Sequence, residues 1–418
     1  MLSGRVEAAR YTRRVLLGGA LVGAGAAADR LLLRPESPPE PPEDGSLNVK
    51  SFGATGDGVT DDRAAWQKAV DAANQARYGG IVVGPPGDYL IGPPGLVMPT
   101  NAQKPIKLQG TSMAGTGEIG TRLKRNGPYT LLTAKGTGTA GTEVNTGLSL
   151  ADLTLWGADA SGSLVILEQC AHVTFERVRL AHSADPALLA SQLWNSSFYR
   201  CNFEGSGSAP RAIPAVLITS GVSLTDTVQL TNCIFESNAF DDLVLDGAPG
   251  KPANAVQLAN CKFERSGGVG LTFRNAQYSG MVGGSMYTSS AGPCVREEGG
   301  SFNNRLVGVN FASNPSPAAP QLVHLVHGRN MVVVGNSFYG GAAANVHLEE
   351  GYGVATVWAN VHERLASEAF VADARTAKSG LVQGDRQPVG GSRGGNEALA
   401  DLLRALAATG LIEDGSKP

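Results

Sequence analysis

The sequence predicts an all-β fold: a right-handed parallel β-helix of about 8–11 stacked coils, with an N-terminal capping helix and a short C-terminal helix. Three observations predict it. One pattern repeats eight times between residues 150 and 338, each repeat contains a bend residue at a fixed place, and further apolar pairs follow the repeat. A spacing of 23 to 32 residues indicates stacked units, none of which can bury its apolar face alone.

Each repeat ends on a large apolar residue, which we call the marker. The eight markers are Leu155, Leu180, Phe203, Phe235, Phe263, Met286, Phe311 and Phe338. Five positions earlier lies a second apolar residue, namely Leu150, Phe175, Phe198, Leu230, Leu258, Met281, Leu306 or Val333. Three positions earlier lies the bend residue, namely Asp152, Arg177, Arg200, Asn232, Asn260, Gly283, Gly308 or Gly335. Six of these eight are Asp, Asn or Gly, which tolerate a left-handed backbone. A two-residue period that breaks at a bend and resumes excludes an amphipathic helix.

A third apolar pair follows the marker in several repeats. Leu243 with Leu245, Leu271 with Phe273, and Val346 with Leu348 lie 8 and 10 residues after their markers, and Leu164 with Ile166 and Val216 with Ile218 look equivalent. We therefore expect about three strands in each coil, one tight turn of fixed length, and looser turns that absorb insertions such as 204–213 and 312–321. The alternative is a β-sandwich of short strands. A sandwich would not keep the bend residue in register through eight repeats.

The composition agrees with a folded, turn-rich chain. Its 418 residues include 55 Gly, 42% are hydrophobic and 17% are charged, which is too apolar for a disordered chain. A net charge of −3 argues against a nucleic-acid partner. Cys201, Cys233 and Cys261 occupy the same place in successive repeats, which predicts a buried thiol ladder, with disulfides between neighbours as the alternative. The six histidines show no metal-binding spacing, so we predict neither a metal site nor a cofactor.

The N-terminus predicts export. Residues 12–17 (TRRVLL) open an apolar stretch of 14 residues that ends at small residues. Fourteen residues are too few to span a bilayer, which needs about 20. The adjacent arginines resemble a twin-arginine signal, which exports folded proteins, and an ordinary secretory signal is the alternative. We assign 1–28 to this signal and 29–46 to a Pro-rich linker. We expect a secreted or cell-surface protein with no membrane span after signal removal.

Residues 48–91 carry a resemblance to a known superfamily. They combine NVK at 48–50, FGA at 52–54, GDG at 56–58, GGIVV at 79–83 and PPGDY at 85–89. This segment resembles the N-terminal segment of the pectate-lyase-like superfamily, which includes polygalacturonases, rhamnogalacturonase relatives and phage tailspikes. The resemblance extends to about residue 364 and implies a β-helix domain over 47–364 with a polysaccharide partner.

Three aspartates in this segment invite a catalytic interpretation, but a structural one is better. Asp57 begins a turn, and Asp61 or Thr60 can cap a helix that starts near Arg63. The expected helix places Trp66, Ala69, Val70 and Ala73 on one face. We expect it to close one end of the stack, which would otherwise expose unpaired strand edges. Asp62 belongs to the same structural group.

The resemblance to polygalacturonases implies catalytic residues in the coils. Asp241 and Asp242 match an aspartate pair before a strand, whereas Val269 occupies the place of the expected histidine and Arg296 is displaced from the expected Arg-x-Lys. Residues 213–216 lack the expected Asn-x-Asp. We therefore take Asp241 and Asp242 as catalytic candidates and Arg296 as a substrate-binding candidate. A structural alternative is that Asp242 tolerates the bend before the strand. The outward positions expected on this face are Val244, Thr272, Val295 and His347.

A second candidate site lies one residue after the markers. Glu204, Glu236 and Glu264 should stack about 4.8 Å apart on the outside of neighbouring coils. Trp156, Tyr287 and Tyr339 extend the same column. Acids flanked by aromatic platforms suit a sugar chain, so we take the glutamates, Trp156 and Tyr287 as substrate-binding candidates. A solvated edge is the alternative, with Arg200 and Arg265 neutralising part of the charge.

The C-terminus forms a separate segment. Residues 365–395 are expected to be a flexible linker, because 379–395 are Gly-rich and polar. Residues 396–412 predict an amphipathic helix with a leucine stripe, which must dock on the solenoid or on other copies. The segment is similar to terminal helices of phage fibre and tail proteins, which implies a homotrimer.

Two functions follow from these observations. The first is an exported carbohydrate-active protein, a polysaccharide hydrolase or lyase with a degenerate polygalacturonase-like site. The second is a non-catalytic glycan-binding or adhesive solenoid, similar to a tailspike. A structural surface protein is a third class, for which the sequence holds no positive sign.

Overall fold

The computed structural model describes residues 46–113, 120–139, 141–288, 292–313, 321–340, 344–362, 369–376, 380–382, 387–389, 397–408 and 412–414. The chain divides into two compact units, Met1–Pro38 and Pro39–Pro418. The expected signal at 1–28 and the linker before residue 46 lie outside the described residues. In the part of the chain that is described, no helix has the length and apolarity to cross a membrane.

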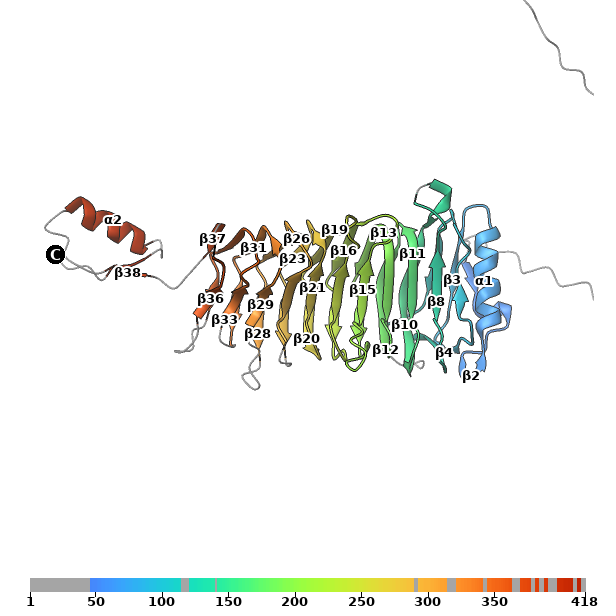
Figure 1. Ribbon diagram of the computed structural model, residues 1–418. Coiled ribbons are helices and arrows are strands. Elements are labelled where there is room, and N and C mark those ends of the chain that lie inside the picture. Colours follow the sequence, from blue (N-terminus) through green and yellow to red (C-terminus); the bar gives the residue numbers. More distant parts are fainter. Residues whose placement is uncertain are drawn as a thin grey trace, which may run out of the picture. The chain divides into compact units, whose positions relative to one another are not determined.

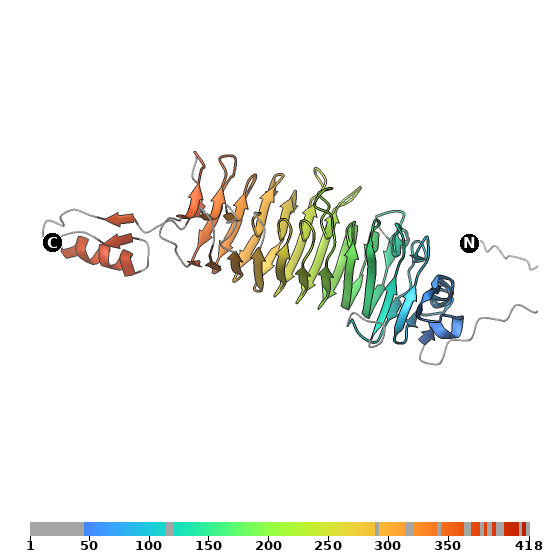
Figure 2. The same cartoon turned by 90° about the horizontal axis from the view of Figure 1, so that it is seen from below.

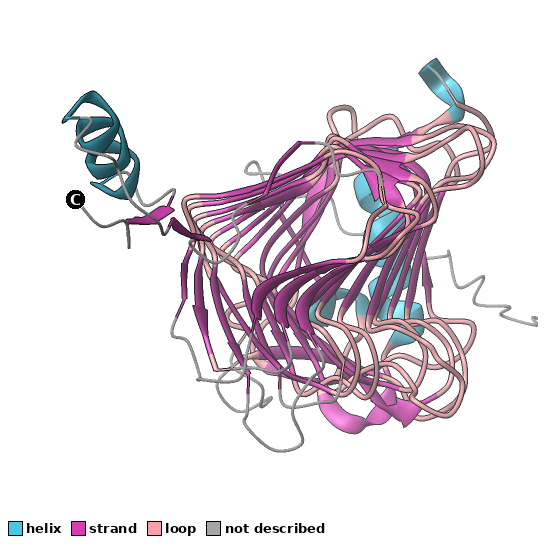
Figure 3. Cartoon of the chain, turned by 60° about the vertical axis from the view of Figure 1, so that its left-hand side comes forward, coloured by secondary structure: helices cyan, strands magenta, loops and turns pink. Residues whose placement is uncertain are grey.

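The second unit is a parallel β-solenoid of about 11 turns, as predicted. Its strands stack in three sheets, whose successive coils line up in Figure 3. Sheet I contains β1 (Ser46–Asn48), β3 (Gly80–Val83), β6 (Ile106–Gln109), the first parts of β10 (Leu148–Ala160) and β12 (Thr174–Ser183), the ends of β13 (Leu188–Tyr199), β16 (Thr225–Thr231) and β19 (Ala253–Ala259), then β23 (Gly280–Val282), β27 (Arg305–Val307), β31 (Met331–Val334), β34 (Ala355–Trp358) and β37 (Gly380–Val382).

Sheets II and III complete each coil. Sheet II contains β2 (Asp57–Asp61), β4 (Gly87–Leu90), β7 (Thr121–Lys124), the second parts of β10 and β12, β14 (Asn202–Glu204), β17 (Ile234–Glu236), β20 (Lys262–Ser266), β24 (Ser285–Thr288), β28 (Asn310–Ser313), β32 (Ser337–Tyr339) and β35 (Val361–His362). Sheet III contains β5 (Leu96–Val97), β8 (Leu132–Lys135), β11 (Val165–Ala171), the start of β13, β15 (Val216–Thr219), β18 (Leu243–Asp246), β21 (Leu271–Arg274), β25 (Val295–Glu298), β29 (Gln321–Leu325), β33 (Ala344–Leu348) and β36 (Ala369–Asp373).

Short strands follow the corner between sheets III and I. They are β9 (Asn145–Thr146), β22 (Ala276–Gln277), β26 (Ser301–Phe302) and β30 (Gly328–Arg329). Two single-turn helices, η1 (Val49–Phe52) and η2 (Gly141–Glu143), lie in the first coils.

The bend between sheets I and II is the most regular feature of the coils. All eight predicted bend residues have a positive φ, between 51° and 67°. This left-handed backbone turns the chain within one residue, so the bend has the same length in every coil. Arg177 and Arg200 adopt it at φ 52° although arginine carries a steric penalty there.

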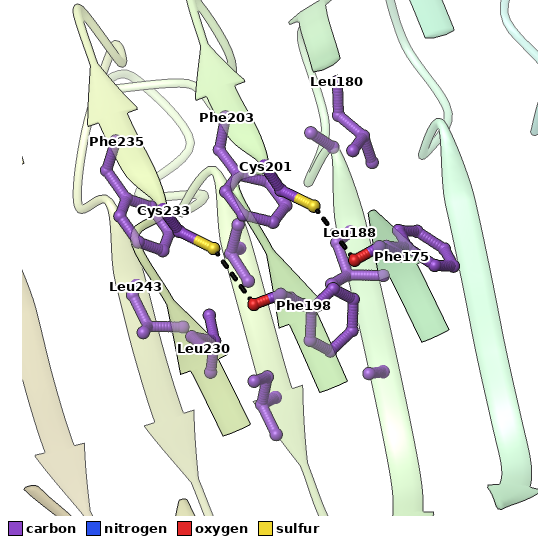
Figure 4. Packing of buried hydrophobic residues seen from close by; sticks show 14 of the residues in the cluster. Phe175, Leu180, Leu188, Phe198, Cys201, Phe203, Leu230, Cys233, Phe235 and Leu243 are labelled. Carbon is purple, nitrogen blue, oxygen red and sulfur yellow. Dashed lines mark hydrogen bonds between the residues drawn. The ribbon is translucent and has the colours of Figure 1, made fainter. Parts of the chain in front are cut away.

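The markers form a continuous buried column, as predicted. They pair in register from Leu155 to Phe338, and each is at most 2% exposed. The thiol ladder is also confirmed: Cys201 and Cys233 are buried and unbridged, and their Sγ atoms lie 3.6 and 3.4 Å from the carbonyl oxygens of Phe175 and Phe198, respectively (Figure 4). The core therefore consists of columns of like residues.

Helix α1 (Arg63–Gln75) closes the first coil of the stack (Figures 1 and 2). Its buried face contains the four residues that the sequence predicted, all 0% exposed. Asp61 accepts from the backbone N–H of Arg63 at 3.0 Å and of Gly92 at 2.9 Å, and Asp62 accepts from that of Gly56 at 3.0 Å. The aspartates of this segment therefore accept hydrogen bonds from backbone N–H groups and have the structural role that was expected.

The paired strands run past the boundary expected at residue 364. β36 pairs with β33, and β37 pairs with β34, so part of the segment expected to be a linker continues the stack. The expected C-terminal helix is present as α2 (Glu397–Ala408), beside the pair β38 (Gln387–Val389) and β39 (Ile412–Asp414). In α2, Leu403 is buried, and Leu399 and Leu402 are exposed.

Two expected registers in sheet III are wrong by one residue. Val165 and Leu167, not Leu164 and Ile166, pair with Leu188 and Ala190 in the buried column. Likewise Arg296, not Val295, is the neighbour of Thr272 on the outside. The other expected pairs of sheet III, such as Leu243 and Leu245 with Leu271 and Phe273, are in register as predicted. The turns before sheet III differ in length between coils, so counting from the marker fixes the register in some coils only.

Candidate functional site

Asp242, one of the two catalytic candidates, is part of the core. It is 0% exposed, it accepts a hydrogen bond from Nδ2 of Asn238 at 2.7 Å, and it accepts a second from the hydroxyl of Ser266. Burial raises the pKa of Asp242 to about 7. Its backbone is not left-handed, so it does not relax a bend. The carboxyl of Asp242 therefore links Asn238 and Ser266 inside the core.

Asp241 has different surroundings. It lines a hollow of about 360 Å³ with Asp246 and Arg274, and the other lining residues are mostly apolar. Its Oδ1 accepts from the backbone N–H of Val269 at 2.8 Å, and burial raises the pKa of its carboxyl although this hydrogen bond opposes the change. Arg274 donates to Asp246 at 3.1 Å. The hollow therefore holds one carboxyl with a raised pKa and one in an ion pair.

The glutamate column exists and is neutralised by basic side chains. Glu204, Glu236 and Glu264 are consecutive partners in sheet II, and their side chains are 25%, 27% and 29% exposed. Each has its own cation, namely Arg179, Arg265 and Lys262, respectively. Arg265 was expected there, whereas Arg200 instead lies over the ring of Tyr199 at 5.1 Å. The column is a row of ion pairs and not a free acidic patch.

The aromatic residues extend this column as the spacing predicted. Trp156 precedes Ala181 and Glu204 in the register, and Tyr287 follows Glu264. Tyr339 lies two coils beyond Tyr287. Tyr287 is 38% exposed and Tyr339 is 64% exposed, so sheet II presents aromatic rings along its length.

Trp156 lies at the centre of a cationic cluster. The ring of His182 is 4.1 Å from it, between centroids, with the planes inclined by 33°. The guanidinium groups of Arg122 and Arg179 lie 5.5 and 5.8 Å from the indole, within the range of a cation–π contact. Nδ1 of His182 is 3.2 Å from Asp159. These contacts fix the indole, so that it forms a pre-organised platform.

A hollow of about 610 Å³ opens beside this platform. It is lined by Gly58, Val59, Leu90, Arg122, Lys124, Arg125, Asn126, Trp156 and Ala158. Arg122 is paired with Asp88, its Nε donating at 2.8 Å. Arg125 is 1% exposed and donates to carbonyl groups, and burial lowers its pKa. Lys124 forms no ion pair with the described residues. The hollow is therefore lined by basic side chains, and the amino group of Lys124 is available to a ligand.

A second polar column lies on the outside of sheet III. Thr272, Arg296, His324 and His347 are consecutive partners. Nε2 of His324 lies 2.8 Å from Oε1 of Glu349, and the same carboxylate oxygen lies 3.6 Å from Nε2 of His347. The described residues contain no group of three or more His, Cys, Asp or Glu side chains placed to hold a metal ion.

Comparison with known proteins agrees with this architecture. Residues 46–197 match the model of the family described as rhamnogalacturonase A/epimerase, pectate lyase-like. The matched segment contains helix α1 and the first coils of the β-helix. Among curated proteins, a stretch of 49 residues (12% of the chain) is 55% identical to the plasmin and fibronectin-binding protein A of Streptococcus pneumoniae. A stretch of 44 residues (10% of the chain) is 61% identical to the mannuronan C5-epimerase AlgE6 of Azotobacter vinelandii. The matches span only 7% and 5% of those two proteins.

Solved structures share the fold at low sequence identity. The A-module of the mannuronan C-5 epimerase AlgE4 from Azotobacter vinelandii superimposes with a TM-score of 0.59 at 17% identity, over 81% of this chain and 100% of that one. The surface adhesin PfbA of Streptococcus pneumoniae gives 0.58 at 16% identity, over 78% and 91%. Tailspike protein 2 of an Escherichia coli O157:H7 bacteriophage gives 0.56 at 15% identity, over 75% and 42%. These likenesses establish the β-helix fold.

Several site residues were missed by sequence reasoning. Arg122 and His182 belong to strands before and after that of Trp156, and only the coil register brings them to its ring. Asp246 and Arg274 follow the last apolar residues of β18 and β21, a place that could have been read as a second outward column. His324 lies beside Arg296 in the outer column of sheet III, a place that the one-residue register error concealed.

Proposed function

We propose that this β-helix binds an anionic polysaccharide along the outside of sheet II. The observation that carries the proposal is the Trp156 platform, whose indole is fixed by His182 and two guanidinium groups beside a basic hollow. An indole face packs against the C–H face of a sugar ring. Lys124, which forms no ion pair with the described residues, supplies positive charge for an acidic group of such a chain.

The rest of the sheet suits an extended ligand. The outside of a stack of parallel strands is long and regular, and Tyr287 and Tyr339 offer further rings in the same column as Trp156. The names of similar proteins support the same ligand class, since the AlgE proteins are epimerases of mannuronan and PfbA is a surface adhesin. Less than a tenth of these curated relatives is matched, so the ligand class rests on the geometry of Trp156.

The test is a binding titration with defined polysaccharides. Mannuronan, polygalacturonate and neutral dextran are titrated into the protein by calorimetry. We expect the two anionic chains to bind and dextran to bind at least tenfold more weakly. Trp156→Ala should lower the affinity for the anionic chain about tenfold, equivalent to about 1.4 kcal/mol. Tyr78→Ala is the matched control, since Tyr78 is 74% exposed and lies outside sheet II. Equal affinity of the wild type, Trp156→Ala and Tyr78→Ala for the anionic chain would contradict the proposal.

A second candidate function is cleavage of the glycan at the Asp241 hollow. The observation that favours it is the pairing of a carboxyl with a raised pKa, Asp241, with the ion-paired Asp246 in one hollow. Glycoside hydrolysis uses one protonated and one ionised carboxyl. In this second proposal Asp241 is the acid and Asp246 replaces the buried Asp242 as its partner.

Three finer proposals concern location and assembly. We propose a secreted or cell-surface protein, exported by a twin-arginine-type signal at residues 1–28. We also propose that α2 joins copies of the chain as a homotrimer, because the exposed Leu399 and Leu402 leave an apolar edge on this helix. A mass measurement tests the trimer: removal of 396–418 should convert it to a monomer, and a monomeric full-length chain would contradict it.

A further inference from the structure

The outer column of sheet III contains three polar side chains on consecutive strands. Thr272 pairs with Arg296, and Arg296 pairs with His324, so the three side chains lie about 4.8 Å apart along the stack. This column is separate from the Trp156 platform on sheet II. None of its three side chains contributes to the Trp156 platform or to the hollow beside it.

Each of these three side chains holds a buried polar atom without a partner. They are Oγ1 of Thr272, Nε of Arg296 and Nδ1 of His324, and they are three of only eight such atoms found in the described residues. A buried donor or acceptor without a partner costs about 1–3 kcal/mol. Three such atoms in one row indicate that a group other than the described side chains satisfies their hydrogen-bonding capacity.

Arg296 is the centre of the row. It is only partly exposed, and among the described residues it has neither a hydrogen-bond acceptor nor a carboxylate in ion-pair contact. The nearby Asp241, whose pKa Arg296 lowers through space, accepts from the backbone of Val269 instead. A guanidinium group removed from water is normally paired with an anion.

His324 makes the row sensitive to protonation. Its Nε2 faces the carboxylate of Glu349 at 2.8 Å, which places the proton of the neutral ring on Nε2 and leaves Nδ1 as a lone pair. Burial lowers the pKa of His324, with Glu349 acting in the opposite direction and Arg296 and His347 adding to the lowering. These effects favour the neutral ring, which offers a second N–H only when it takes up a proton.

We propose that Arg296, Thr272 and His324 bind an oxyanion, namely a carboxylate, sulfate or phosphate group. Nε of Arg296 and the hydroxyl of Thr272 donate to the anion, and His324 takes up one proton from solvent so that Nδ1 donates as well. Glu349 keeps the charge of the imidazolium ring balanced on its Nε2 side. Binding and protonation of His324 are then coupled, so that the anion binds more tightly at low pH.

The experiment titrates the full chain with two probes, sulfate and monomeric galacturonate, while the imidazole signals of 15N-histidine-labelled protein are followed by NMR. Both probes keep their charge between pH 5.5 and 8, so any pH dependence belongs to the protein. We expect saturable shifts of His324, with affinity that falls up to about tenfold per pH unit above the pKa of the free ring. Preference for galacturonate identifies a sugar acid as the ligand, and preference for sulfate identifies an inorganic oxyanion.

Variants separate the site from general charge effects. Arg296→Gln should weaken binding at least tenfold, whereas Arg305→Gln, on sheet I and bonded to Gln257 at 2.6 Å, should not. Should Arg296→Gln fail to fold, Arg296→Lys keeps the charge without Nε and should still weaken binding. His324→Gln should abolish the pH dependence of binding, whereas the His347→Gln protein should keep it.

Two outcomes would overturn the proposal. One is a set of NMR shifts that do not saturate with either probe, and the other is a set of shifts that persist unchanged in the folded Arg296 variant. Trp156→Ala should leave sulfate binding unchanged, which separates this test from that of glycan binding.

Discussion

The phenyl rings of Phe235 and Phe263 lie 4.4 Å apart between centroids, with their planes inclined by only 3°. Phe203 continues the stack, 4.9 Å from Phe235. Parallel strands with no shift in register place identical side chains directly above one another, so the same rotamer can repeat from coil to coil. The ring of Phe235 is therefore packed on both faces by phenyl rings.

Phe235→Asp should prevent folding, because an unpaired buried charge adds several kcal/mol to the lost packing of the ring. Phe263→Asp should do the same. Glu236→Ala, at the next and outward position, is the control and should fold with a nearly unchanged melting temperature. Soluble yield and thermal unfolding measure the effect. A soluble Phe235→Asp protein with the wild-type melting temperature would show that the marker column is not the core.

Stability should fall with rising pH because of two buried carboxyls. Burial raises the pKa of Asp242 from 3.8 to about 7 and that of Glu297 from 4.5 to about 7. The folded state binds these protons more tightly than the unfolded state, so their contribution is complete below about pH 4 and is lost as pH rises through 7. Asp242→Asn and Glu297→Gln mimic the protonated forms.

Each variant should therefore gain stability relative to the wild type between pH 5 and 8, by at most about 1.4 kcal/mol per unit of pKa shift. Urea unfolding across this range measures the difference. A constant difference between wild type and variant at every pH would mean that neither carboxyl changes its protonation on folding.

If the protein cleaves a glycan at the Asp241 hollow, Asp241→Asn and Asp246→Asn should each lower the rate about 100-fold. Reducing ends and absorbance of unsaturated products are both measured, since they distinguish hydrolysis from elimination. Glu168→Gln, which removes a surface ion pair with Lys135, is the control. Full activity in both aspartate variants would show that the reaction is not catalysed at this hollow.

Replacement of Arg13 and Arg14 by lysine should block export if the signal is of the twin-arginine type. The folded β-helix should then accumulate inside the cell, where its melting temperature should equal that of the exported protein. Cell fractionation measures this distribution. Normal secretion of the double variant would indicate the general secretory route instead.

The sequence predicts the fold wherever one residue sets the geometry. The bend between sheets I and II needs a left-handed residue at a fixed distance from the marker, so eight bends and eight markers were located correctly. Sheet III follows turns of variable length. There the spacing gives the register in some coils only. Leu243 and Leu245 pair with Leu271 and Phe273 as expected, whereas Val165 and Arg296 were each misplaced by one position.

The candidate site was less accessible to sequence reasoning, because it depends on side chains from different coils. The column of Trp156 and the glutamates was visible, since it has a fixed offset from the marker. Most of its cations were not visible. Arg179 comes from the preceding coil, 25 residues before Glu204, and reaches it only in the folded stack. Lys262 lies two residues before Glu264 on the same strand. The burial of Asp242 was also hidden, because adjacent aspartates look alike in a sequence.

The unequal corners of the coil have a practical consequence for protein engineering. The bend between sheets I and II tolerates no change in length, while the turns between sheets II and III already differ from coil to coil. New peptide loops grafted at the second corner, for example within 204–213, should be displayed at intervals set by the strand spacing. The solenoid can thus carry foreign recognition loops at separations that are multiples of the spacing between coils.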